Sequence, residues 1–270
     1  MGSLFLRLVE TMPSPRQHGI EKRYTSIDDL LDNATIDIVY VSLPNHMRTP
    51  AVLAEAKRGK AILSEKSLAT TMEDSKAIEK AVKDADVFFL EGLMYLTHPL
   101  MNKTQELLLE GRIGTVRGVS GYYSANIWKK ANPLSMGTIY NLGCYPVSLL
   151  HFVIETAFGS GAFAKRQLHD FGNISTEGNV RMRDASLAVR FDNGVLASSQ
   201  STDSYGNDSF AILGDKGRIR FDEPLAANCR RQHYRDQNLR RRDGAGSCPS
   251  RVGCVRLPGK EGGKVSASRC

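Results

Sequence analysis

The sequence lacks the long apolar segments that membrane proteins and secreted precursors carry. No apolar run approaches the roughly eighteen residues that a membrane-spanning helix needs. The opening stretch, MGSLFLRLVETM, has neither a long apolar core nor a small-residue cleavage site. Hydrophobic residues nevertheless make up 41% of the 270 residues, which is enough to bury one large core or two ordinary ones. We therefore expect a globular, soluble, cytoplasmic protein with no membrane partner.

Cysteine is also scarce over most of the chain. Of the five cysteines, only Cys144 precedes residue 229, and no two are spaced as Cys-x-x-Cys. Structural zinc sites are usually built from such closely spaced pairs. The sequence therefore predicts no metal site, and a zinc site formed by the later cysteines with His233 is the alternative.

A basic charge excess is absent from the body of the chain, although the net charge is +7. Residues 229–270 hold nine arginines and two lysines against two aspartates and one glutamate, so the rest is close to neutral. This tail has no helical or alternating period, which predicts disorder. A basic arm that touches RNA or anionic lipid is one interpretation, and a passive C-terminus is the other. Nucleic acid is expected as a partner only through this tail.

The first ordered region alternates between apolar runs and helical patterns. A short helix is predicted after Ser26, with Asp29 completing its cap, and another after the capping pair Thr71 and Asp74. Between these two, a helix is predicted to begin at Thr49-Pro50, with the proline in its first position. Strands are predicted at residues 36–42, 60–65 and 87–92. Strands joined by helices imply parallel pairing with right-handed crossovers, as in the later part of a doubly wound domain.

The pattern changes beyond Pro99. A helix at residues 100–110 and an apolar segment at residues 137–158 are followed by strands with alternating apolar positions and few helices between them. This indicates a large, mostly antiparallel sheet. The predicted fold class is α/β, an incomplete Rossmann-like parallel sheet followed by an α+β domain. The predicted domains are residues 1–98, residues 99–228 and a basic tail at residues 229–270.

Polar residues follow each predicted strand of the parallel sheet. In such sheets, ligands bind outside the carboxyl ends of the strands. The ends are residues 43–46, 64–67 and 91–94, and Lys66 is the most informative charged residue among them. A lysine beside an apolar strand end can lose hydration, which lowers its pKa and lets it exchange protons with a hydroxyl. A solvated lysine paired with Glu65 is the alternative.

Eight segments in a fixed order carry a family resemblance. They are YTSIDDLL, IDIVYVSLPN, GKAILSEKSLA, LEGLMYLTHP, LLLEGRIGTVRGV, YNLGCYPVSLL, FDNG and ILGDKGRI, and they span about residues 19–224. This order resembles the glucose-fructose oxidoreductase and inositol dehydrogenase (Gfo/Idh/MocA) family. The resemblance implies a Rossmann domain for NAD or NADP, and a second domain whose open sheet covers the nicotinamide. It also implies a sugar, polyol or cyclic diol as substrate and a homo-oligomer formed through the second sheet.

The resemblance also implies roles for two motifs. The family's Glu-Lys-Pro motif, whose lysine lies near the nicotinamide and the reacting carbon, matches Glu65, Lys66 and Ser67. Its Asp-x-Gly-x-His or Asp-x-Gly-x-Tyr motif matches the segment from Asn141 to Tyr145. Because an asparagine carries no carboxylate charge, acid and base work shifts to the tyrosine, whose phenolate a nearby lysine ammonium would stabilise.

Cofactor contacts follow from the same resemblance. The implied catalytic residues are Lys66, Tyr145 and Asn141, and the implied cofactor-binding residues are Leu43, Pro44, Asn45, His46, Glu65, Lys66 and Glu91. The central expectation is spatial: the Lys66 ammonium and the Tyr145 phenol should meet across a cleft between the two sheets.

A glycine-rich phosphate-binding turn is missing from the beginning of the sequence. No Gly-x-Gly-x-x-Gly pattern occurs before Gly19, and the similar string GSGAFA at residues 159–164 follows a predicted helix instead of a strand. We therefore expect the chain to lack the N-terminal part of the domain and to bind its cofactor with reduced affinity. The alternative function is a catalytically inactive, truncated family member that serves as a binding or dimerisation module.

Overall fold

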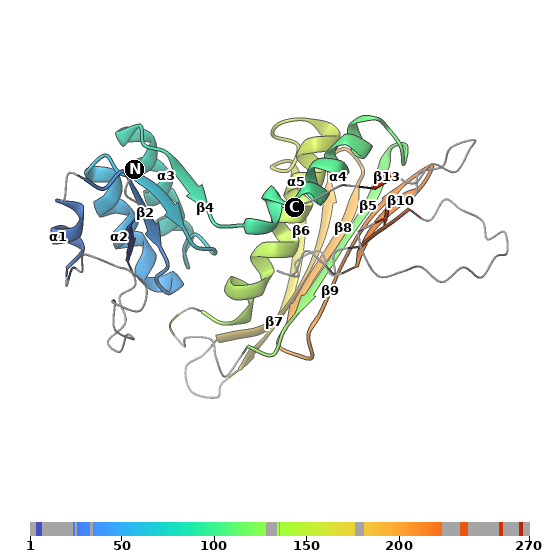
Figure 1. The fold of residues 1–270 in the computed structure, drawn as a ribbon. Helices are drawn as coiled ribbons and strands as arrows, with labels where there is room; N and C mark the ends of the chain where they lie inside the picture. The colour runs from blue at the N-terminus through green and yellow to red at the C-terminus, as the bar shows by residue number, and fades with distance from the viewer. Residues whose placement is uncertain are drawn as a thin grey trace. The chain divides into compact units, whose positions relative to one another are not determined.

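The structure is a computed structural model with two compact units (Figure 1). It describes residues 4–6, 24, 26–32, 35–127, 134, 136–175, 181–222, 233–236, 254–255 and 265–266. The first unit comprises Met1–Leu93 with Asn132–Met136, and the second comprises Met94–Ala131 with Gly137–Cys270.

The first unit is built on a parallel sheet. Its strand order is β1-β2-β3-β4, formed by Leu4–Leu6, Ile38–Val41, Ala61–Ser64 and Phe89–Glu91. Helix α2 (Asn45–Lys57) connects β2 to β3, and helix α3 (Met72–Ala85) connects β3 to β4. Because Ile62 of β3 lies opposite both Val39 and Phe89, the three predicted strands are in parallel register and their prediction is confirmed.

Two predicted helix starts are also confirmed. The Ser26 hydroxyl accepts a hydrogen bond from the Asp29 N–H at 3.0 Å, which caps helix α1 (Ile27–Leu31). The Thr71 hydroxyl accepts one from the Asp74 N–H at 3.1 Å and caps α3. These caps satisfy amide groups that a helix start leaves without an internal partner, which is why the short pattern predicts them well.

The predicted start of α2 is wrong. The helix begins at Asn45, so Pro50 lies inside it instead of at its first position. A proline inside a helix removes one backbone hydrogen bond. The sequence therefore favoured a helix that starts at the proline over one that starts earlier. The extra turn is held by the buried Arg48, whose guanidinium donates to the carbonyls of Leu43 and Ser67. Tertiary hydrogen bonds therefore outweigh the local cost of the proline.

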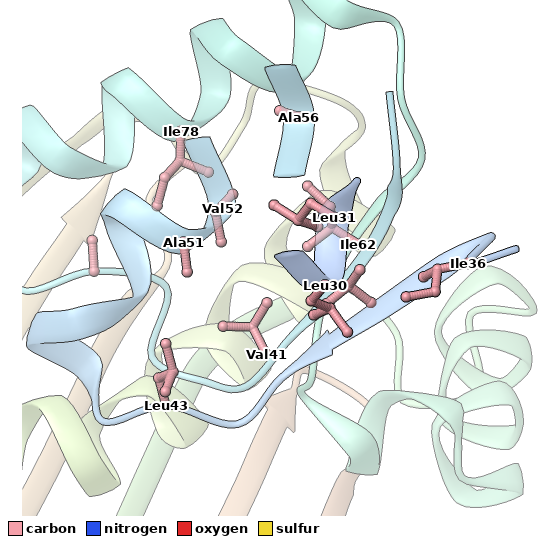
Figure 2. Packing of buried hydrophobic residues seen from close by; sticks show 12 residues of the cluster. Leu30, Leu31, Ile36, Val41, Leu43, Ala51, Val52, Ala56, Ile62 and Ile78 are labelled. Carbon is pink, nitrogen blue, oxygen red and sulfur yellow. The ribbon is translucent and has the colours of Figure 1, made fainter. Parts of the chain in front are cut away.

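The core of the first unit lies between the sheet and its helices (Figure 2). Val41 and Ile62 of the sheet pack with Val52 of α2 and Ile78 of α3. Leu30 and Leu31 of α1 complete the cluster, each no more than 2% exposed. Alternate residues of β2 and β3 are buried, so Tyr40, next to the buried Val39 and Val41, points to the other face of the sheet.

The second unit contains a seven-stranded sheet of order β11-β10-β9-β5-β8-β7-β6. All neighbouring strands pair antiparallel except β5 and β8, which confirms a mostly antiparallel sheet. In chain order the strands are β5 (Val116–Ser124), β6 (Arg166–Ser175), β7 (Arg181–Phe191), β8 (Leu196–Thr202), β9 (Asn207–Gly214), β10 (Arg218–Asp222) and β11 (His233–Asp236).

Helices cover one face of this sheet. The short helix η2 (Met94–Thr97) leads into α4 (Pro99–Leu109), and α5 (Cys144–Phe158) packs on β5 and β8 (Figure 1). Along β8, buried and exposed residues alternate, with Ala197 buried and Leu196 exposed. Within the described ranges, the sheet therefore has one face packed on helices and one open face.

The predicted disordered tail, residues 229–270, lies mostly outside the described residues and stays a prediction. The described parts of it are β11 and the paired strands β12 (Cys254–Val255) and β13 (Val265–Ser266). Within the described residues, every helix is too short or too polar to span a bilayer.

Candidate functional site at the strand ends

The carboxyl ends of β2, β3 and β4 form one polar edge in the first unit. The Glu65 N–H donates to the Val41 carbonyl at 2.9 Å, and the Gly92 N–H donates to the Ser64 carbonyl at 2.7 Å. These two bonds tie the ends of neighbouring strands together. They place the segments with Lys66 and Glu91 at the same edge, where parallel sheets bind ligands.

The Glu65 carboxylate is held by two donors. The Tyr40 hydroxyl donates to its Oε1 at 2.5 Å, and the Lys66 backbone N–H donates to its Oε2 at 3.3 Å. The hydrogen bond to Glu65, together with burial, raises the pKa of Tyr40 to about 12, while the charge of Arg48 opposes the rise. Tyr40 therefore stays protonated near neutral pH and keeps donating to Glu65. Tyr40 could not be recognised from the sequence, because an alternating position in a strand gives no sign of a polar partner.

Arg48 is a second residue that the sequence assigned to no site. It is only 5% exposed, and its Nε donates to the Leu43 carbonyl at 2.8 Å while its Nη1 donates to the Ser67 carbonyl at 2.5 Å. The two carbonyls belong to the turns after β2 and β3. Arg48 therefore fixes these turns to each other, and with them the backbone that follows Lys66.

Glu91 is the acidic residue at the end of β4. Burial raises the pKa of its carboxyl, while the Leu68 N–H and the positive charges of Arg48 and Lys66 lower it. The opposing effects show that this carboxyl lies within electrostatic range of both cations. The predicted residues Glu65, Lys66 and Glu91 are thus brought together with Arg48 at one edge of the sheet.

The turn after β2 supplies the remaining predicted cofactor contacts. Leu43 and Asn45 are buried, and Pro44 lies between them as the residue before α2. Among the described residues, the buried Nδ1 of His46 makes no hydrogen bond. Such an atom normally finds a partner, so it fits a hydrogen bond to a bound ligand.

The fit to a dinucleotide is therefore one-sided. The strand-end residues offer the mixture of carboxyl, ammonium and imidazole groups that a nicotinamide and its ribose could contact. The described turns after β2 and β3 contain no glycine, so neither resembles a phosphate-binding turn. The described turns after β2 and β3 thus offer polar groups for the nicotinamide side of such a cofactor, and neither of these two turns is built to bind its diphosphate.

The second motif begins with a π-helix, Ile139–Gly143, which runs directly into α5. π-helical turns are rare and often occur at functional sites. The Asn141 Nδ2 donates to the Gly137 carbonyl at 2.7 Å, which fastens the start of this turn. Among the described residues, the buried Thr138 hydroxyl makes no hydrogen bond.

Tyr145 lies in a cluster of tyrosines and is 7% exposed. Its ring centroid is 5.3 Å from that of Tyr123 and 5.9 Å from that of Tyr95. Its hydroxyl lies 3.9 Å from the Met94 sulfur. The Tyr95 hydroxyl and the Ser148 hydroxyl are 2.5 Å apart, and that serine donates to the Tyr145 carbonyl at 2.9 Å. The ring of Tyr145 is therefore positioned by aromatic packing that the motif alone did not predict.

Lys66 and Tyr145 belong to different compact units. Each unit holds its own half of the predicted site in a defined local geometry. Their meeting across a cleft stays a prediction.

Backbone amides of the segment GSGAFA bind a carboxylate of the protein itself, that of Glu155. The segment follows the end of α5, and the Glu155 carboxylate accepts hydrogen bonds from the Gly161 and Phe163 N–H groups, both at 2.7 Å. These bonds lower the pKa of Glu155. The interpretation that this string is no cofactor loop is consistent with this arrangement. Among the residues that the structure covers, no cluster of three or more His, Cys, Asp or Glu side chains could hold a metal ion.

The fold and its strand-end site define a two-domain α/β protein with a Rossmann-like first domain. Two family models match it in order, "Oxidoreductase family, NAD-binding Rossmann fold" over residues 9–93 and "GFO/IDH/MocA C-terminal domain" over residues 101–220. The chain belongs to the Gfo/Idh/MocA oxidoreductase family. The resemblance noted in the sequence is therefore confirmed.

Several characterised proteins are similar to this chain. The D-xylose 1-dehydrogenase (NADP(+)) 2 of Haloferax volcanii is 31% identical over 144 residues, which cover 51% of this chain and 44% of the relative. The levoglucosan dehydrogenase of Pseudarthrobacter phenanthrenivorans is 26% identical over 236 residues, covering 77% and 60%. The chain thus spans less than two thirds of the length of these relatives.

Solved structures share the fold. A levoglucosan dehydrogenase in complex with NADH and levoglucosan superposes with a TM-score of 0.67 and 22% identity, covering 82% of this chain and 66% of that one. The aldose-aldose oxidoreductase of Caulobacter crescentus, complexed with glycerol, gives a TM-score of 0.70 and 22% identity, covering 87% and 72%.

Proposed function

We propose that this protein is an NAD(P)-dependent oxidoreductase that acts on a CH–OH group of a sugar, polyol or cyclic diol. One observation carries the proposal: Lys66 lies at the carboxyl edge of a parallel sheet, beside Glu65 and within electrostatic range of Glu91. This is the place where the family motif requires its lysine. Relatives named for xylose, levoglucosan and trans-1,2-dihydrobenzene-1,2-diol support the substrate class.

Lys66 and Tyr145 would together handle the proton of the reacting hydroxyl group. The bound nicotinamide would supply or accept the hydride. The Lys66 ammonium would donate a hydrogen bond to the substrate oxygen and favour the charged form of the tyrosine, whose unperturbed pKa is about 10. Asn141 would act through the backbone, because its amide fastens the turn that carries Tyr145.

The cofactor would be held by the turn after β2 and by the ends of β3 and β4. Leu43, Pro44, Asn45 and His46 would contact the ribose and nicotinamide, and Glu65, Lys66 and Glu91 would complete this part of the cofactor site. Because the sequence has no Gly-x-Gly-x-x-Gly pattern before Gly19, we expect weak binding of NADH and NADPH. A fluorescence titration tests this, and micromolar affinity would contradict the expected weak binding.

Activity is tested by comparing Lys66→Met with Lys76→Met, an exposed lysine on α3. Substrate-dependent reduction of NAD⁺ or NADP⁺ should be measured with xylose, levoglucosan and a trans-dihydrodiol. Loss of the Lys66 ammonium, on which proton transfer by the tyrosine depends, should lower turnover about 10²- to 10⁴-fold in the first variant and leave the second unchanged. Equal turnover in both variants would remove Lys66 from the mechanism.

A second function is a binding or dimerisation module without turnover. The lack of a Gly-x-Gly-x-x-Gly pattern before Gly19 in the sequence favours it, as do Leu196 and Leu213, which expose apolar surface on the open sheet face. A folded sample that forms dimers through this face and shows no activity with any substrate would support it. We expect a cytoplasmic location for either function, and cell fractionation tests this expectation.

A further inference from the structure

Strand β6 ends the large sheet of the second unit. It is ten residues long, and among the described residues it pairs only with β7. Every residue from Arg166 to Ile174 is exposed, so neither face of the strand is covered by the described part of the chain. At the opposite end of the sheet, the edge strand is β11, which is four residues long and pairs with β10.

Three large apolar side chains stand on this edge strand. Leu168 is 49% exposed, Phe171 77% and Ile174 58%. Natural edge strands are usually short, or protected by proline, lysine or a covering element, because an open edge pairs with other strands. β6 has neither proline nor lysine. A long open edge that exposes apolar side chains between polar ones can serve as a docking surface for another strand.

The sequence of β6 is complementary to itself about Phe171. When two copies run antiparallel with Phe171 opposite Phe171, Leu168 of each copy lies opposite Ile174 of the other. In the same register His169 faces Asn173 and Asp170 faces Gly172, so no like charges are opposed. Directly opposed apolar pairs stabilise antiparallel strands, and opposed like charges destabilise them.

Other registers lose this match. A continuous sheet requires opposed residues on the same face, so the register can move only in steps that keep odd residues opposite odd ones. Centring the pair on Asp170 opposes two carboxylates, and centring it on Gly172 places Phe171 opposite Asn173 and Ile174 opposite Asp170. Only the register centred on Phe171 pairs all three apolar side chains with apolar partners.

We propose that β6 is a homodimer interface, at which two copies of this chain pair edge to edge and antiparallel about Phe171. The partner is a second copy because the matching pairs are symmetric about one residue, as a two-fold interface demands. A foreign peptide would need only alternating apolar residues. This interface is separate from the open sheet face and does not depend on the proposed enzymatic function.

Light scattering after gel filtration tests the interface on the full chain. Phe171→Lys places two ammonium groups opposite each other, so it should weaken this association at least about tenfold and halve the mass at a fixed concentration. The matched control is Leu196→Lys, which adds the same charge to an exposed leucine on the open face. It should leave the edge pairing intact. A wild-type monomer at 100 micromolar, or a dimer lost only in the control, would overturn the proposal.

Cysteine cross-linking tests the register. Mild oxidation of Phe171→Cys should join two copies through residue 171, and peptide mapping by mass spectrometry separates this link from those of the native cysteines. Gln167→Cys is the control, because residue 167 is exposed on the same strand but lies far from its own copy in this register. In this register residue 167 of one copy lies opposite residue 175 of the other, so the two copies of residue 167 are roughly eight residues apart along the interface. Because a strand rises about 3.3 Å per residue, this separation is too long for a disulfide. Equal linkage through 171 and 167 would refute the register.

Discussion

The buried carboxyl of Glu55 should make the first unit less stable as the pH rises. Glu55 lies on α2 and is 2% exposed, and its Oε2 makes no hydrogen bond to the described residues. Burial raises the pKa of Glu55 from 4.5 to about 8. The folded protein therefore keeps this group neutral at a pH where the unfolded chain ionises it. The perturbation that exposes this effect is Glu55→Gln, which imitates the neutral acid at every pH.

The magnitude follows from the difference between the two pKa values. The stability contributed by the neutral group is fully present below about pH 4.5 and is lost as the pH rises through the folded value of about 8. One pKa unit corresponds to about 1.4 kcal/mol, so the wild type should lose about 2–3 kcal/mol relative to the glutamine variant between about pH 5 and about pH 7.

The assay is urea unfolding of both proteins, followed by circular dichroism across this pH range. Subtracting one curve from the other cancels the titration of every other group that both proteins share. Hydrogen–deuterium exchange of residues 45–57 locates the effect on α2. Glu73→Gln, at an exposed position of α3, is the control and should change stability by less than about 0.5 kcal/mol at any pH.

A difference between wild type and Glu55→Gln that does not change with pH would refute this reasoning. So would a glutamine variant that is less stable than the wild type at pH 8. Either result would mean that the Glu55 carboxylate has a stabilising partner when it is ionised.

Two further predictions concern groups that fasten loops. Arg48→Met should destabilise the first unit by about 2–3 kcal/mol, because the carbonyls of Leu43 and Ser67 lose a charged donor. Urea unfolding measures this, and full rescue by Arg48→Lys would contradict a role for the two-pronged guanidinium. Glu155→Gln should remove a stabilisation that exists above about pH 4.5 and disappears as the pH falls through the lowered pKa of Glu155. Thermal unfolding of both proteins from pH 7 to pH 3 should therefore converge at low pH, and curves that stay parallel would speak against the two hydrogen bonds.

Elements with a short-range cause were predictable from the sequence. The strands at Val39, Ile62 and Phe89 follow from apolar runs, and the caps at Ser26 and Thr71 follow from side chains that bond their own helix start. The family and its order of two domains follow from eight segments in sequence. None of these needs knowledge of which distant residues touch.

The candidate site was predictable only in part. Parallel strands align their carboxyl ends, so the grouping of Glu65, Lys66 and Glu91 could be expected from the topology. The hydrogen bond from Tyr40 and the two from Arg48 could not, because each joins segments that the sequence separates. The predicted start of α2 at Thr49-Pro50 was wrong for the same reason, because the hydrogen bonds of Arg48 to distant carbonyls hold the earlier turn.

The sequence by itself thus determined the family, the two successive sheets and the edge at which Lys66 lies, because these depend on periodicity and chain order. The tertiary structure decided which polar groups hold that edge, how the tyrosines surround Tyr145, and that β6 is left at the end of its sheet. Those features arise from contacts between residues far apart in the chain, and the local pattern of a sequence does not encode such pairings one by one.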